Sequence, residues 1–171
     1  MTTGAAFAAD PMLRFSKKAD YALIALKHLA SCAPGSSSNA REIAGCYDIP
    51  VELMAKVLQR LVRTGIVASH QGTRGGYQLA RAATLISVAD VIQAIDGPVL
   101  VTACSDEDES CEQYAKCNVR DPLWRLKDRI VQSLASFTVN ELVSDEPPEP
   151  LPLTVVRRPA ESTFSVPAAA D

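Results

Sequence analysis

The sequence predicts a mainly α-helical fold that contains one small β-hairpin. Apolar residues recur at three- and four-residue steps in several segments between residues 17 and 143, which is the spacing of helices with one buried face. One glycine-rich stretch, residues 71–76, lies between two short apolar runs and predicts the hairpin. With 171 residues, 47% of them hydrophobic, the chain has enough apolar material for one domain of ordinary size with appendages.

The first half of the chain predicts three helices followed by the hairpin. Ser16 is a candidate N-cap of the first helix, and Ser38 or Asn39 of the second. Pro50 suits the first position of the third helix, and Gly65 suits its end. We expect the helices at residues 17–32, 40–46 and 50–64 and the strands at 66–70 and 77–80. On the third helix the apolar side chains expected to face the core are Leu53, Val57, Leu58, Leu61 and Val62.

The order helix, helix-turn-helix, hairpin is that of a winged helix-turn-helix domain. An ordinary helical hairpin in another kind of bundle would share the helical part of this pattern. The exit from the third helix through Gly65-Ile-Val into an Arg- and Gly-rich hairpin favours the winged helix. The glycines do not predict a nucleotide-binding loop, because they follow no strand of a βαβ unit and open no helix.

Three more helices are expected in the second half. The first, residues 88–95, follows the candidate cap Ser87 and ends at Asp96-Gly-Pro; a short one, residues 139–143, follows Thr138. Between them, residues 122–136 form a long helix with a sustained apolar stripe. That stripe either packs back onto its own domain or pairs with a second copy. We favour a dimerisation helix, because Asp96-Gly-Pro and a polar loop separate it from the winged domain.

These expectations divide the chain into five parts. Residues 1–11 are a disordered leader, 12–97 the winged helix-turn-helix domain, and 98–121 a cysteine-bearing loop. Residues 122–144 are the dimerisation helix region, and 145–171, rich in Pro, Glu, Ser and Ala without periodicity, are a disordered tail. No apolar run approaches the length that spans a bilayer, so no membrane partner is expected.

Charge is distributed unevenly between the two halves. The net charge is −3, but residues 12–81 carry ten Lys and Arg against four acids, whereas residues 82–171 carry seven basic and fifteen acidic residues. The basic half is where a phosphate backbone can dock. The candidate DNA-binding residues, from the start of the first helix, the second and third helices and the hairpin tip, are Arg14, Lys17, Arg41, Glu52, Lys56, Gln59, Arg60, Gln71, Thr73 and Arg74.

Three of the five cysteines, Cys104, Cys111 and Cys117, lie within fourteen residues of an acidic loop. The chain shows no secretory signal, which favours a reducing, cytoplasmic setting where such groups are more often metal sites than disulfides. Soft thiolates favour zinc or an iron–sulfur cluster, and the wide C-x6-C-x5-C spacing suits a bulky cluster better than one tetrahedral ion. Three spare thiols on a surface loop are the alternative. Cys32 and Cys46 lie on apolar helix faces and are expected in the core.

Several motifs together resemble a known family. They are Leu13-Arg-Phe-Ser-Lys-Lys-Ala-Asp-Tyr-Ala-Leu, Arg41-Glu-Ile-Ala, Leu58-x-x-Leu-Val-Arg-x-Gly-Ile-Val, Arg74-Gly-Gly-Tyr-Gln-Leu, Ile92-x-Ala-Ile-Asp-Gly-Pro, the three loop cysteines and the Trp124 helix. From about Met12 to Val143 the chain resembles the iron–sulfur winged-helix transcription regulators of the IscR and NsrR type, which include regulators of SUF cluster-assembly operons. The resemblance implies cytoplasmic homodimers that bind palindromic promoter sites in double-stranded DNA. It also implies a [2Fe–2S] or [4Fe–4S] cluster whose state sets the affinity.

The resemblance leaves the fourth cluster ligand open. Where the IscR branch has a histidine three residues after the last cysteine, this chain has Arg120, which is donor-only and cannot ligate iron. Asp20 matches the acidic residue that completes the cluster from the partner subunit in the nitric-oxide-sensing branch. It would be a hard ligand on a labile corner, or else a solvated residue paired with Lys17. Further candidates are Asp121, Glu112, His28 and a small-molecule ligand.

Two other functions fit the same residues. A carrier or assembly protein for clusters or metals would transfer its cluster without binding a specific DNA sequence. A cluster-free thiol redox regulator would use disulfides among the loop cysteines. An enzyme is not expected, because no paired catalytic constellation is visible and only two histidines, His28 and His70, are present.

Overall fold

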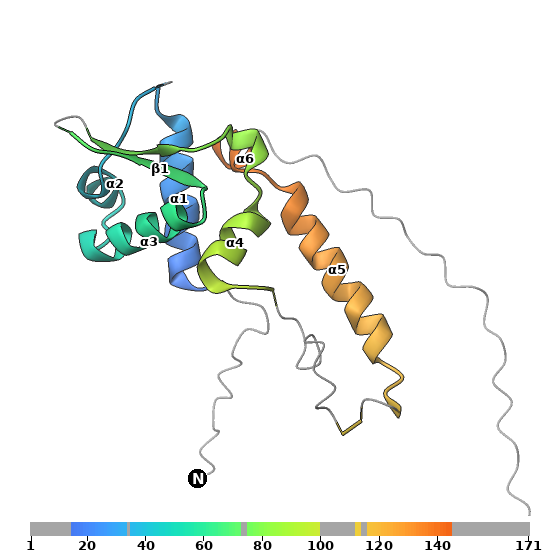
Figure 1. Ribbon diagram of the computed structural model, residues 1–171. Coiled ribbons are helices and arrows are strands. Elements are labelled where there is room, and N and C mark those ends of the chain that lie inside the picture. The colour runs from blue at the N-terminus through green and yellow to red at the C-terminus, as the bar shows by residue number, and fades with distance from the viewer. Residues whose placement is uncertain (1–14, 34, 73–74, 100–111, 114–115, 145–171) are drawn as a thin grey trace, which may run out of the picture.

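The computed structural model describes residues 15–33, 35–72, 75–99, 112–113 and 116–144. The predicted leader and tail and most of the cysteine loop therefore lie outside the described residues. Figure 1 shows the first four helices and the hairpin gathered into one body, from which α5 runs outward. The elements are α1 (Lys17–Ser31), α2 (Ala40–Cys46), α3 (Val51–Arg63), β1 (Val67–His70), β2 (Gly76–Leu79), the 3-10 helix η1 (Ala83–Leu85), α4 (Val88–Asp96), α5 (Arg120–Ser136) and α6 (Val139–Val143).

Side-chain caps mark where α1, α2, α4 and α6 begin, whereas α3 and α5 begin without one. The Ser16 hydroxyl accepts a hydrogen bond from the Ala19 N–H at 3.2 Å, as predicted for the start of α1. At α2 the cap is Asn39, whose side chain accepts from the Glu42 N–H while the Glu42 carboxylate accepts from the Asn39 N–H, both at 2.9 Å. Reciprocal boxes of the same kind begin α4 at Ser87 and α6 at Thr138.

The wing is tied to the loop between α1 and α2. Strands β1 and β2 pair antiparallel, with Val67 opposite Leu79 and His70 opposite Gly76. Beyond this pair, Ser38 exchanges both backbone hydrogen bonds with Tyr77, at 3.1 and 2.9 Å. A Cβ at Gly76 would lie 2.9 Å from the Ser38 carbonyl oxygen, so only glycine permits this approach. The hairpin is therefore held against the helical body along one edge.

The core lies between α1, α3 and α4, and one prediction about α3 is wrong. Leu53 is 37% exposed, whereas Met54, which was not among the predicted core residues, is fully buried. Helix α3 turns residues three and four apart toward α1, and Leu53 lies about 100° round the helix from Met54. The fully buried large side chains are Leu26, Ile43, Met54, Leu58, Leu61, Ile86, Val67, Val91 and Val139.

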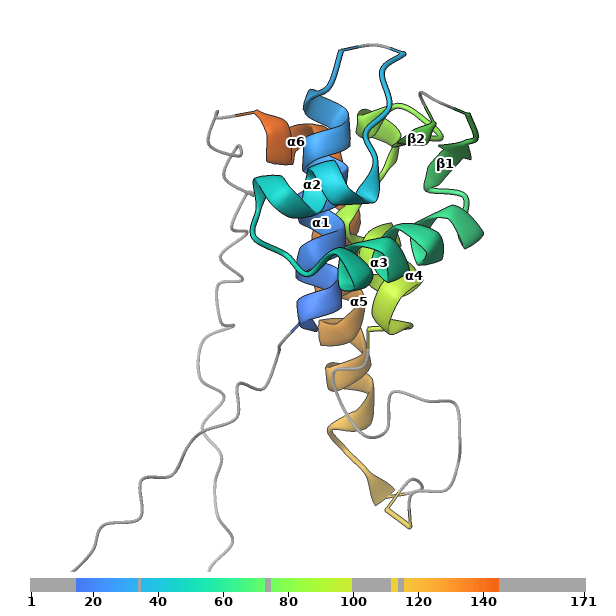
Figure 2. The same cartoon turned by 90° about the vertical axis from the view of Figure 1, so that its left-hand side faces the viewer.

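Helix α6 returns to the winged domain, although the sequence division grouped it with the dimerisation helix. Val139 is fully buried and belongs to the same core cluster. Its N–H donates to the Ile86 carbonyl, and the Val88 N–H donates to the Phe137 carbonyl, both at 2.8 Å. Figure 2 shows α6 beside α1. The C-terminal end of α5 is thereby anchored to the winged domain.

Helix α5 itself has no buried residue, although it contacts α4. It begins two residues before the predicted start and carries an apolar stripe in which Leu126 is 46% exposed. Within the described part of the chain, no helix is both long enough and apolar enough to cross a bilayer. The stripe is thus incompletely covered by the described residues of a single chain.

The cap of α6 predicts a pH-dependent contribution to stability. Hydrogen bonds from the Thr138 backbone and hydroxyl hold the pKa of Glu141 below its ordinary value. Because the folded-state pKa is lowered, this contribution is present above the unfolded pKa and is lost as the pH falls through the folded pKa. Thermal midpoints of wild type and Glu141→Gln, measured from pH 7 to pH 3, should therefore differ most near neutrality and converge in acid. A difference that is constant with pH, or that also appears in Asp128→Asn, contradicts this assignment.

Candidate functional site

Helices α2 and α3 form a helix-turn-helix whose second helix presents a polar outer face. The turn passes through Asp48, whose φ is +52°, and is anchored by buried Ile49. While Met54 and Leu58 hold α3 to the body, the opposite face is exposed to solvent. The exposed polar side chains of α3 are Glu52, Lys56, Gln59, Arg60 and Arg63.

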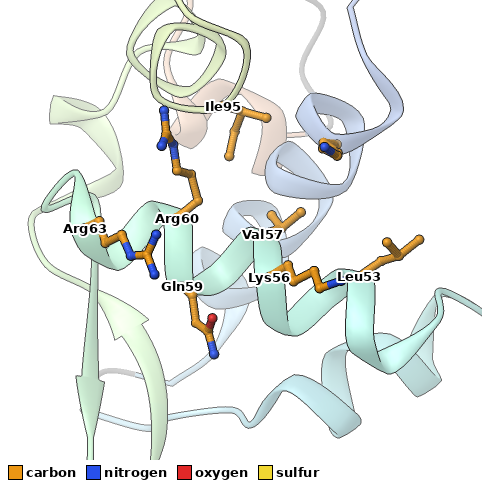
Figure 3. A pocket seen from close by; sticks show the side chains of 8 residues that line it. Leu53, Lys56, Val57, Gln59, Arg60, Arg63 and Ile95 are labelled. Atoms are coloured by element: carbon orange, nitrogen blue, oxygen red, sulfur yellow. The ribbon is translucent and has the colours of Figure 1, made fainter.

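A surface hollow of about 460 Å³ lies between α3, the start of α1 and the end of α4 (Figure 3). Its apolar part comes from Leu53, Val57 and Ile95. Four cations from two helices border it: Lys18, Lys56, Arg60 and Arg63. Lys18 and Arg63 were not among the predicted DNA-binding residues. The available signal was the spacing of Arg63, which lies four residues after Gln59 and seven after Lys56 on the same helix face.

Arg60 is directed differently from its neighbour Gln59. Its Nε donates to the Ala94 carbonyl of α4 at 2.8 Å. Figure 3 shows the Arg60 side chain directed toward α4, whereas Gln59 points to the other side of α3. Gln59 and Arg63 also border a smaller hollow of about 200 Å³ that is shared with Ser69 and Tyr77 of the wing. The exposed face of α3 is therefore continuous with the hairpin.

The remaining predicted DNA-binding residues are dispersed around this face. Lys17, at the start of α1, Arg41, in the first turn of α2, and Gln71, directly after β1, are all exposed. Arg14, Thr73 and Arg74 lie outside the described residues, so their predicted contacts stay predictions.

Of the predicted cluster ligands, the structure describes only part. Cys117 is a half-buried free thiol three residues before α5, while Cys104 and Cys111 lie outside the described residues. Among the residues described, no three potential metal ligands come together. The Nε of Arg120 lies 2.8 Å from the Asp121 carboxylate, and its guanidinium lies 5.6 Å from the Trp124 ring centre. A donor-only side chain held in this way cannot itself ligate a metal.

Asp20 is exposed in the first turn of α1. Within the described residues, Asp20 and Lys17 form no ion pair with each other, so the alternative pairing does not occur. Of the further candidates, His28 has its Nδ1 3.3 Å from the Tyr47 hydroxyl, and Asp121 pairs with Arg120. Asp20 thus has a solvent-accessible carboxylate, and its predicted role as a cluster ligand stays a prediction.

The two remaining cysteines, Cys32 and Cys46, differ in how far they are buried. Cys32 is half-buried, and its thiol donates to the His28 carbonyl at 3.3 Å. Cys46 is exposed at the end of α2, so its predicted place in the core is wrong. Helix α2 has only seven residues, and its buried side chains, Ile43 and Ala44, leave Cys46 on the outer side.

Comparison with known proteins shows which protein family has this arrangement of helices and wing. Residues 15–145 match the Rrf2 family, described as iron-dependent transcriptional regulators. The chain belongs to the Rrf2 family. Its homologues are transcriptional regulators, a class of proteins that are generally not enzymes. The predicted winged-helix resemblance to regulators of the IscR type is confirmed.

The similar proteins agree on the fold and the class. The HTH-type transcriptional regulator IscR of Pectobacterium atrosepticum is 33% identical over 135 residues, 78% of this chain and 81% of that protein. An HTH-type regulator of Mycobacterium tuberculosis is 41% identical over 87 residues, and the match spans about half of each chain, 51% and 54%. The structure of CymR, the global cysteine regulator of B. subtilis, matches with a TM-score of 0.64 and 26% identity over 79% of this chain and 99% of that one. The predicted fold class, mainly helical with a two-stranded hairpin, is confirmed.

Proposed function

We propose that this Rrf2-family regulator is a cytoplasmic homodimer that binds palindromic promoter DNA with an affinity set by an iron–sulfur cluster on Cys104, Cys111 and Cys117. The observation that carries the proposal is the cationic outer face of α3 in the same chain as three closely spaced thiols. The target genes that fit best are those for cluster assembly or stress responses.

The DNA part of the proposal rests on the exposure of α3. An α-helix fits the major groove, where Glu52 can accept from cytosine N4 and Lys56 can donate to guanine. Lys18 and Arg63 stand beside this face and suit phosphate oxygens. The wing would place Gln71, Thr73 and Arg74 in the adjacent minor groove.

The dimer part rests on α5. Its apolar stripe has no buried side chain in the described chain, and a second copy offers the same stripe as a self-complementary partner. Antiparallel or crossed pairing of two such helices would fix the separation of two α3 helices. A palindromic site requires about 34–36 Å between them, one turn of DNA.

The cofactor part rests on the chemistry of the donors. Three thiolates supply soft ligands, and Asp20 of the partner subunit supplies a hard fourth ligand. An iron–sulfur cluster held there would supply a group that responds to iron, oxygen or nitric oxide. The chain's own residues would orient it, and Arg120 would place a positive charge beside it through its bond to Asp121.

The visible absorption spectrum of anaerobically purified protein tests this proposal. We expect a coloured protein containing iron and acid-labile sulfide, and different Kd values for its promoter when the cluster is loaded and removed. A loaded cluster without a DNA footprint would indicate a carrier or assembly protein. A colourless protein whose footprint changes on thiol oxidation would indicate a thiol redox regulator, which the similarity to the cysteine regulator CymR also supports.

Arg74 is expected to enter the minor groove from the wing, where its charge lies close to the phosphates of both strands. Arg74→Ala should therefore weaken binding to every DNA sequence and reduce the slope of log K against log salt by about 1. Titrations at several salt concentrations measure this slope. Lys27→Ala, which removes an exposed cation from the far end of α1, is the control and should leave the slope unchanged. If Arg74→Ala binds DNA with wild-type affinity and wild-type slope, the wing is not part of the DNA interface.

A further inference from the structure

The last turn of α4 is bonded both to α3 and to Ser16, the residue that caps the start of α1. The Ala94 carbonyl accepts from Arg60 Nε of α3 at 2.8 Å. Two positions later, the Asp96 carboxylate accepts from the Ser16 N–H at 3.1 Å and from the Ser16 hydroxyl at 2.5 Å. Ile95 between them borders the cationic hollow together with Lys18. One helical turn thus joins the two segments that border the proposed DNA surface.

The bond to Ser16 positions more than one residue. Ser16 is the N-cap of α1, and its hydroxyl accepts from the Ala19 N–H while it donates to Asp96. Lys17, Lys18 and Asp20 follow within the first turn of α1. A displacement of Asp96 would therefore also displace Lys17, which is a predicted DNA-binding residue, and Lys18, which borders the hollow. It would displace Asp20, the proposed fourth cluster ligand, as well.

The same turn of α4 is the point at which the chain leaves for the cysteines. Val91 and Ile92 are buried and anchor the preceding turn, whereas Asp96 is exposed. Helix α4 ends at Asp96 and is capped by Gly97, whose φ of +94° favours glycine and redirects the backbone. In the sequence, Cys104 follows Asp96 by eight residues. Along the chain, α4 is therefore the last described helix before the segment that carries Cys104.

We infer that Ser16, Asp96 and Arg60 are positioning residues that transmit the state of the cysteine loop to the DNA-reading surface. The inference rests on the proposed function and adds the route of its regulation. A rearrangement of the loop shifts the last turn of α4, and that shift moves α3 through Arg60 and the start of α1 through Ser16. Such a route is measured as a coupling free energy between the cysteine loop and the DNA-reading surface.

The test is the ratio of DNA Kd values between cluster-free and cluster-loaded protein. In wild type we expect a ratio of about 5-fold or more, the usual range of allosteric coupling. In Asp96→Ala the ratio should fall to within about twofold of 1, because the link to α1 is lost. Each sample is brought to the same iron and sulfide content before titration, because a shift of the first turn of α1 also moves Asp20, the proposed fourth ligand.

Conservative variants separate positioning from simple destabilisation. Asp96→Asn and Ser16→Thr keep hydrogen-bonding groups in place and should retain most of the wild-type ratio. Asp128→Ala, which removes an exposed carboxylate from α5, is the matched control. If Asp96→Ala fails to fold by circular dichroism, Ser16→Ala takes its place and should show the same loss.

The outcomes distinguish this inference from the proposed function. A wild-type ratio retained in both Asp96→Ala and Ser16→Ala overturns the coupling route and leaves cluster-dependent binding intact. A wild-type ratio of 1 overturns the proposed function, and the coupling route with it. A ratio lost equally in Ser16→Thr and Asp96→Asn assigns the effect to local packing and also overturns the route.

Discussion

Replacing Cys111 by serine is expected to abolish both iron retention and the dependence of DNA affinity on the cluster. A neutral serine hydroxyl is a poor substitute for a soft thiolate, and two remaining thiols with one carboxylate hold a cluster weakly. The ratio of Kd values between loaded and cluster-free states should fall from about 5-fold or more to about 1. Iron and sulfide assays on anaerobic protein, followed by DNA titration, measure both effects.

Cys46→Ser is the matched control for this prediction. Cys46 is an exposed thiol at the end of α2, so its loss tests thiol chemistry in general without touching the loop. We expect unchanged iron content and an unchanged Kd ratio. Full iron and sulfide in Cys111→Ser, or equal losses in both variants, would contradict the assignment of Cys111 as a ligand.

Met54→Ala is expected to have the largest effect on stability. Met54 is fully buried between α3 and the rest of the core, and removal of such a side chain typically lowers the free energy of unfolding by about 2–5 kcal/mol. Leu53→Ala, one position earlier, should lower it by less than about 1 kcal/mol, because the side chain is already 37% exposed. Urea unfolding at fixed protein concentration measures both.

The pair also tests how α3 is oriented. If Leu53→Ala proves as costly as Met54→Ala, then α3 is rotated by about one residue from its place in the structure. Such a rotation would also move Glu52 and Lys56 away from the outer face. The stability comparison therefore checks, without any DNA, the orientation on which the proposed interface depends.

Helix boundaries were predicted well because capping is local. Ser16, Ser87 and Thr138 each bond to a backbone N–H three residues later, so sequence neighbours alone identify the start of the helix. Errors arose where one face of a helix had to be chosen. Leu53 and Met54 are both apolar, and periodicity alone does not decide which of two adjacent residues faces the core. Likewise, the spacing of apolar residues around Val139 did not indicate that α6 packs against the winged domain.

The residues of the candidate site show the same difference: some could be selected from the sequence, and others only from the folded structure. The exposed cations of α3 could be selected from charge and helical spacing, and the loop thiols from their residue type. The direction of Arg60 could not, because it depends on where a carbonyl of α4, thirty-four residues away, lies in space. Lys18 joins the hollow for the same reason, since the start of α1 approaches α3 only in the folded chain.

By itself, the sequence determined the order of the elements, their caps, the uneven charge and the three thiols of the cysteine loop. Each of these depends on residue type or on neighbours within about four positions. Tertiary structure alone decided that Ser16 meets Asp96 across eighty residues and that Val139 completes the core. Such contacts depend on the path of the whole backbone, because packing, and not local propensity, selects which distant side chains become neighbours.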